Sequence, residues 1–177
     1  MIHGVTDRGF LVLAAEDQDL FWSGLKDPVE YWGPRGTGPL DAEQSFVLLT
    51  EPAVFFLVRP FLGMSGLRGI VLIDPENTEI SPELENLVRC ADMNIAWKTV
   101  KNMQSDRVIA ALNPKNAEML SEVFGEDEIE WGNRVFLYVT NKKACGIDAC
   151  KGCYLHSPKE KFGINVCCKG PFMPLNM

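Results

Sequence analysis

Cysteine is the residue type in this chain that is best placed for chemistry, and its distribution is uneven. The chain has 177 residues and six cysteines, and five of the cysteines lie between positions 145 and 168. Cys145, Cys150 and Cys153 have the spacing C-x4-C-x2-C, and the pair Cys167-Cys168 follows. This spacing, with a fourth cysteine further on, is typical of plant-type [2Fe–2S] sites, in which four thiolates hold two irons. The pattern predicts a metal centre near the end of the chain.

The fourth thiolate is a choice between two adjacent residues. Cys167 and Cys168 cannot both easily point at one cluster, and the Gly170-Pro171 turn that follows favours Cys167. His156 could also replace a cysteine, as in clusters of mixed ligation. Structural zinc is the competing metal, but zinc ribbons usually pair two C-x2-C knuckles and only one is present. The predicted metal ligands are therefore Cys145, Cys150, Cys153 and Cys167, with Cys168 as the alternative fourth ligand. No catalytic residue is predicted.

Composition narrows the class of protein. The chain is 46% apolar and carries a net charge of −7, which argues against nucleic acid as the main partner. No window of about 18 apolar residues is present, so we expect no membrane span. The first residues lack the pattern of a signal peptide. Clustered cysteines favour metal over disulfides and therefore a reducing cytoplasm.

The elements that must position the cysteines alternate between strand-like and helix-like segments. Apolar runs predict strands, and proline or capping residues predict where helices begin. The expected strands are 9–15, 29–32, 45–50, 69–74, 94–97, 106–112 and 134–139. The expected helices are 53–59, 81–88 with Cys90 late in the same helix, and 115–124 capped by Asn113-Pro114, with an acidic loop at 126–128. This order favours an α/β fold with a mostly parallel sheet. The stretch between the strands at 94–97 and 106–112 is short for a helical crossover.

The residues also resemble a known family. The cysteine segments 144–153 and 166–171 are similar to those of the iron–sulfur electron-transfer subunit of two-subunit dihydroorotate dehydrogenases, a member of the ferredoxin-reductase superfamily. Residues 109–120 resemble the strand-turn-helix before that family's cluster domain, and 33–38 resemble the turn that closes its flavin domain. The resemblance implies a flavin-domain remnant over 1–40, a nucleotide-binding-like α/β domain over 41–140 and a small, loop-rich [2Fe–2S] domain over 141–177.

The chain departs from that family where nucleotides bind. The turn after the first α/β strand has Glu51-Pro52 in place of glycines, so it adds a negative charge and removes a backbone donor. The next turn is Asp74-Pro75-Glu76, and Leu112 stands where the family has a cysteine. No Arg-x-Tyr-Ser/Thr segment of the kind that holds flavin is present. We therefore expect one [2Fe–2S] cluster and neither FAD nor NAD.

These observations predict an electron-transfer protein that works with a redox partner, as a subunit or accessory of an oxidoreductase and within a hetero- or homo-oligomer. The chain is not expected to be catalytic alone. Two alternatives remain open: a reductase subunit that keeps flavin through the Gly33–Gly38 loop or at a subunit interface, and a zinc-binding structural or assembly protein. Trp131, Tyr154 and Phe162 flank the cysteines and could shield a cluster from water.

Overall fold

A computed structural model describes residues 2–6, 9–12, 40, 43–78, 84, 86–138, 154–157, 160–165 and 172–175. The chain divides into two compact units, 1–34 and 35–177. In the first unit, strands β1 (Ile2–Thr6) and β2 (Gly9–Val12) form an antiparallel hairpin. The expected strand at 9–15 is present over its first four residues. The expected strand at 29–32 lies outside the described residues.

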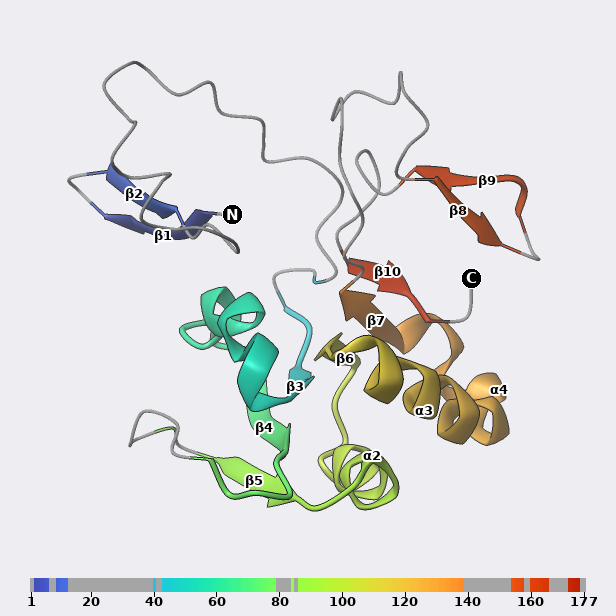
Figure 1. Cartoon of the computed structure of the whole chain (residues 1–177), viewed down its shortest axis with the longest axis horizontal. Helices are drawn as coiled ribbons and strands as arrows, with labels where there is room; N and C mark the ends of the chain where they lie inside the picture. Colours follow the sequence, from blue (N-terminus) through green and yellow to red (C-terminus); the bar gives the residue numbers. More distant parts are fainter. Residues whose placement is uncertain are drawn as a thin grey trace. The chain divides into compact units, whose positions relative to one another are not determined.

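A six-stranded sheet forms the centre of the second unit (Figure 1). Its strands stand in the order β10-β7-β6-β3-β4-β5, and all pairs are parallel except β10 with β7. The mostly parallel α/β sheet expected from the sequence is therefore confirmed. The strand bounds are Phe46–Thr50 (β3), Leu67–Ile73 (β4), Leu87–Cys90 (β5), Arg107–Ala111 (β6), Val135–Tyr138 (β7) and Phe172–Pro174 (β10).

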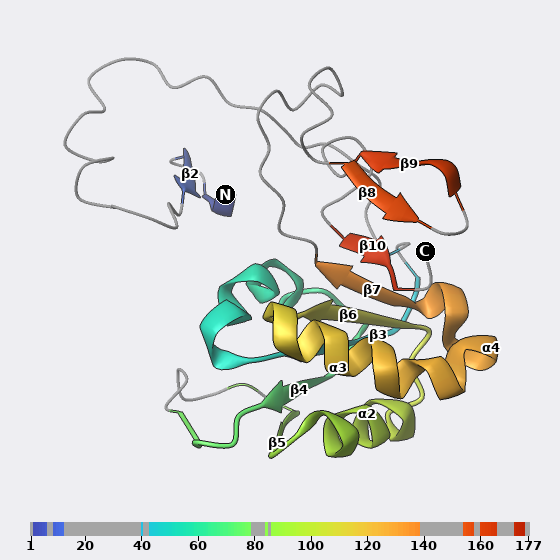
Figure 2. The same ribbon diagram turned by 45° about the vertical axis from the view of Figure 1, so that its right-hand side comes forward.

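Both faces of this sheet are covered, which is why the central strands read as unbroken apolar runs. Val47 and Leu49 point to one face, where the helices α2 (Met93–Asn102) and α3 (Pro114–Phe124) pack. Phe46 and Leu48 point to the other face, which is covered by the 3-10 turns η1 (Pro52–Leu57) and η2 (Arg59–Phe61). Figure 2 shows α2 and α3 side by side along the sheet.

Three short helical segments connect α3 to β7. They are η3 (Gly125–Asp127), α4 (Glu128–Trp131) and η4 (Gly132–Arg134). This stretch holds the acidic loop expected at 126–128, which is helical instead. Asp127 receives hydrogen bonds from Trp97 Nε1 at 2.7 Å and Lys101 Nζ at 2.8 Å, so the segment is tied to α2. These two bonds lower the pKa of Asp127, the one from Lys101 most strongly.

Two of the expected elements are wrong. The helix expected to run through Leu87 and Val88 is a strand, β5, which pairs in parallel with β4. The strand expected at 94–97 is the first half of α2, capped by Asp92, whose carboxylate accepts the Ile95 N–H at 2.9 Å. The helix on this side of the chain therefore begins at Met93, after β5.

The remaining expectations differ only in detail. Residues 53–59 form 3-10 turns rather than an α-helix, with Pro52 in the first turn as expected. α3 is confirmed, including the Asn113 cap and the end at Gly125. Cys90 is buried, and it lies in β5 and not in a helix. Among the described residues, no helix has both the length and the apolarity that a membrane crossing needs.

Candidate functional site

All five clustered cysteines lie outside the described residues, so the predicted ligand set stays a prediction. The described residues hold no group of three His, Cys, Asp or Glu side chains that could bind a metal. What the structure does describe are the strands on both sides of the cysteine segments. These strands form two register pairs that bracket the cysteines in the sequence.

The outer pair joins the strands before and after the whole segment. β7 ends at Tyr138 and β10 begins at Phe172, and these two residues are direct partners across the antiparallel β7–β10 pair. Their rings meet edge to face with centroids 5.2 Å apart, and the Phe172 ring meets Phe61 in the same way at 5.3 Å. Burial raises the pKa of the Tyr138 hydroxyl. The strands on either side of residues 139–171 therefore meet at one aromatic position of the sheet.

The inner pair lies within that segment. β8 (Tyr154–Ser157) and β9 (Glu160–Asn165) form an antiparallel hairpin in which Tyr154 is the partner of Asn165. Residues paired in this way have Cα atoms about 4.5–5.5 Å apart. In the sequence, Cys153 directly precedes Tyr154, and Cys167 is the second residue after Asn165. His156 belongs to β8 and Phe162 to β9.

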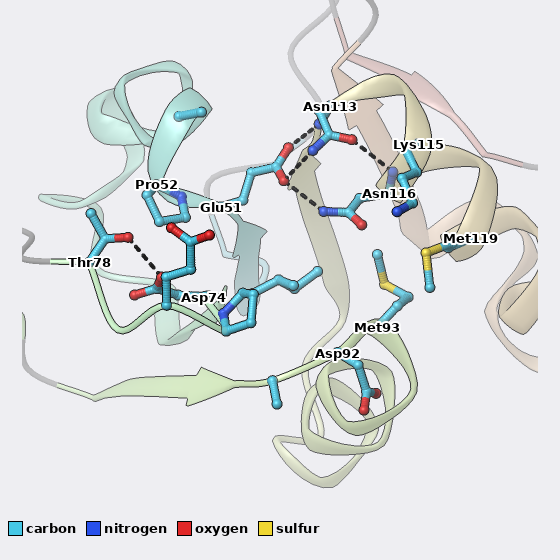
Figure 3. Close-up of a pocket in the computed structure, with 15 residues that line it drawn as sticks. Glu51, Pro52, Asp74, Thr78, Asp92, Met93, Asn113, Lys115, Asn116 and Met119 are labelled. Carbon is cyan, nitrogen blue, oxygen red and sulfur yellow. Dashed lines mark hydrogen bonds between the residues drawn. The ribbon is translucent and has the colours of Figure 1, made fainter.

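A separate crevice lies at the carboxyl ends of β3, β4, β5 and β6, with a volume of about 520 Å³ (Figure 3). In open α/β sheets this edge is where ligands bind, at the point where the strand order reverses. Here the reversal falls between β3 and β6, because β3 continues to β4 on one side and β6 lies on its other side. The crevice is lined by Glu51, Pro52, Ala53, Ile73, Asp74, Pro75, Glu76, Thr78, Ala91, Asp92, Met93, Asn113, Lys115, Asn116 and Met119.

Glu51 is buried at the head of this crevice, directly after β3. Its carboxylate accepts hydrogen bonds from the backbone N–H of Asn113 and, at 2.6 Å each, from the side-chain amides of Asn113 and Asn116. Asn113 is also the cap of α3, since its side-chain oxygen accepts the Asn116 N–H at 2.9 Å. Figure 3 shows the Glu51 side chain directed at the start of α3.

Asp74, directly after β4, is held in a second network. Its carboxylate forms a salt bridge with Arg89 of β5 and accepts the Thr78 hydroxyl at 2.9 Å, and Arg89 also donates to the Thr78 carbonyl at 2.9 Å. Burial alone would raise the pKa of Asp74, but the bonds from Thr78 and the charge of Arg89 outweigh it and lower that pKa. The negative charge is therefore compensated locally.

The sequence identified part of this crevice. Glu51, Pro52 and Asp74 were expected to fill the turns where phosphate would approach, and the structure brings all three to the crevice. The bonds from Asn113 and Asn116 to Glu51 were missed, because they link residues more than 60 positions apart. The Asn113-Pro114 pair indicated a helix cap, but it did not indicate that Asn113 also bonds to Glu51. The salt bridge between Arg89 and Asp74 was not predicted, because the sequence pattern indicated a helix over residues 87–90.

Comparison with known proteins identifies the fold. The chain matches no protein-family profile and no curated protein sequence. Among solved structures it is similar to a chain from an NADH-dependent reduced ferredoxin–NADP oxidoreductase, described for flavin-based electron bifurcation. The TM-score is 0.64 at 13% sequence identity, and the match covers 98% of this chain and 71% of that chain. The two chains therefore share a fold.

Proposed function

We propose that this protein is an electron carrier with one [2Fe–2S] cluster, held by Cys145, Cys150, Cys153 and Cys167 and exchanging single electrons with a partner oxidoreductase. The observation that carries the proposal is the Tyr154–Asn165 pair of the β8–β9 hairpin. A cluster needs a fourth thiolate that returns to the other three. Cys153 and Cys167 are one and two residues from this pair, so the hairpin favours their convergence.

The donor set fits such a cluster. Four cysteine thiolates are soft ligands of the kind that iron–sulfur clusters require, and small residues stand between the first three. The outer pair of Tyr138 and Phe172 supports the proposal, because it brings together the two strands between which the five cysteines lie in the sequence. When bound, a [2Fe–2S] cluster supplies one-electron exchange, and the protein orients it and limits its contact with water.

The crevice supports a carrier rather than a nicotinamide-dependent reductase. Its head is taken by the Glu51 carboxylate, and Asp74, Glu76 and Asp92 add three more carboxylates to its lining, against one amine, Lys115. A pyrophosphate is disfavoured by this charge and by the loss of free donors. The fold shared with that oxidoreductase chain supports a role beside an oxidoreductase. A dihydroorotate dehydrogenase type of partner is the more specific form of the proposal.

Cysteine variants of the full chain, purified without oxygen, test the ligand set. We expect Cys145→Ser, Cys150→Ser, Cys153→Ser and Cys167→Ser each to lose the visible absorption of the cluster. Cys168→Ser is the matched control, since it removes a thiol from the adjacent position, and it should keep the spectrum. If Cys168→Ser loses the visible absorption and Cys167→Ser keeps it, the fourth ligand is Cys168 instead of Cys167. Retention in all variants would refute a cysteine-held cluster.

Flavin binding is the second candidate, favoured by the similarity to an enzyme described for flavin-based electron bifurcation. The loop that would contribute, Gly33–Gly38, lies outside the described residues. Heat denaturation followed by filtration separates the two candidates. A yellow chromophore in the filtrate supports bound flavin, whereas a colourless filtrate from a red-brown protein supports the cluster alone. Zinc in a colourless protein would support a structural or assembly role instead.

A further inference from the structure

The first turn of α3 already holds an anion, which comes from the same chain. α3 has 11 residues, and its first turn presents the backbone N–H of Asn113 and the amides of Asn113 and Asn116 to the crevice. All three donate to the two carboxylate oxygens of Glu51. The start of a helix favours negative charge, because its N–H groups and its dipole point the same way. Glu51 therefore occupies the donors that a phosphate oxygen would use.

The contact between Glu51 and the start of α3 lies at the edge of the sheet where ligands bind in folds of this kind. Glu51 is the first residue after β3 and Asn113 is the second after β6, so the contact spans the point where the strand order reverses. The crevice of about 520 Å³ opens beside it, and the Lys115 amine is in its lining. The crevice therefore adjoins the donors at the start of α3, and the Glu51 carboxylate is already bound to them.

We infer that Glu51 is a built-in anion that keeps phosphate-bearing ligands from the donors at the start of α3. Asp74, Glu76 and Asp92 also add negative charge to the crevice, but the carboxylate bound to these donors is that of Glu51. Asp74 is compensated by Arg89 and Thr78, and the Asp92 carboxylate caps α2 by accepting the Ile95 N–H. Neither of these carboxylates contacts the donors of α3. The inference concerns the crevice alone and holds whether or not the cysteines bind a cluster.

Binding of inorganic pyrophosphate to the full chain, measured by isothermal titration calorimetry, tests the inference. Wild type should bind weakly. Glu51→Ala should bind on the order of tenfold more tightly, because hydrogen bonds from the freed donors to a charged ligand are worth at least that factor. Adding Asn116→Ala to the Glu51→Ala variant should return the affinity toward that of wild type, since it removes one of the freed donors.

Asp92→Asn is the matched control. It removes one negative charge from the same crevice, keeps a residue that can cap α2 and leaves Glu51 in place. The inference is overturned if folded Glu51→Ala binds pyrophosphate no better than wild type, or if Asp92→Asn gains as much. Glu51→Gln keeps the side-chain volume and weakens the contact by removing its charge, so a smaller gain is expected. If Glu51→Ala does not fold, the test uses Glu51→Gln. The inference is then overturned if Glu51→Gln binds pyrophosphate no more tightly than wild type.

Discussion

Tyr154 and Asn165 face each other across the β8–β9 hairpin, and their pairing joins two parts of the chain that each lead directly to cysteines. Cys153 precedes Tyr154, and the Cys167-Cys168 pair begins two residues after Asn165. Tyr138 and Phe172 form a similar pair outside the segment. Five of the six cysteines fall between the two pairs. This nesting supports the proposal that residues 139–171, the cysteine segment, bind one metal centre.

The ring of Phe172 is predicted to stabilise the packing of β10 against β7 and η2. It contacts both Tyr138 and Phe61 edge to face. Phe172→Ala should lower the free energy of unfolding by about 3 kcal/mol, because it removes a large packed ring and leaves a cavity. Phe172→Leu, which keeps most of the apolar volume, should lose less than about 1.5 kcal/mol. Urea unfolding followed by circular dichroism measures both, and equal losses would contradict the packing role.

The two helix caps offer a matched comparison. Asp92 and Asn113 each accept one backbone N–H at 2.9 Å, from Ile95 and Asn116. Asp92→Ala should cost about 1 kcal/mol, the usual value for a lost cap. Asn113→Ala should cost about 2–3 kcal/mol, because it also takes an amide donor from the buried Glu51 carboxylate. The comparison uses urea unfolding midpoints, and a smaller loss for Asn113→Ala would argue against the Glu51 contact.

Replacement by alanine should have different effects on stability at two glycines near the start of β4. A Cβ at Gly66 would clash with the backbone carbonyl oxygen of Gln44, whereas a Cβ at Gly63 would meet nothing within 4 Å. Gly66→Ala is therefore expected to destabilise the protein by about 1–3 kcal/mol, since backbone must shift to admit it. Gly63→Ala should stay within about 0.5 kcal/mol of wild type. Thermal unfolding of the pair provides the test.

Asp127 makes stability depend on pH in a predictable direction. Hydrogen bonds from Lys101 and Trp97 hold the pKa of Asp127 below its unfolded value, which is about 3.9. A carboxylate of this kind stabilises the fold above the unfolded pKa, and the contribution is lost as pH falls through the folded pKa. Asp127→Asn should cost about 1 kcal/mol at neutral pH. The difference from wild type should be constant between about pH 8 and 5 and shrink below about pH 4. If the stability difference between Asp127→Asn and wild type instead grew as the pH fell, the pKa of Asp127 would be raised by folding and not lowered.

Sequence patterns predicted the buried centre of the sheet because its residues follow a simple rule. Runs such as Phe46–Thr50 and Arg107–Ala111 are apolar on both faces, and only a strand covered on both sides tolerates that pattern. The cap of α3 was equally visible, because Asn113-Pro114 combines a capping side chain with a proline in the first turn.

The edge of the sheet was harder to predict. β5 is a four-residue strand with exposed Val88 and Arg89, so its pattern resembles a half-buried helix. α2 begins with β-branched and aromatic residues, Ile95 and Trp97, which favour strands by propensity but are here held by the Asp92 cap and by packing. Tertiary contacts decided both cases. The bonds from Asn113 and Asn116 to Glu51 could not be predicted, because no local pattern links the ends of β3 and β6.

The central claim is that the cysteine segment, residues 139–171, holds a redox-active [2Fe–2S] cluster. The most direct test is the metal content and spectrum of the full chain. Protein purified without oxygen should contain about two irons per chain, be red-brown, and show one paramagnetic centre by EPR after reduction with dithionite. Zinc in a colourless protein, or flavin absorption without iron, would contradict the account. A cluster that dithionite cannot reduce would contradict its role in electron transfer.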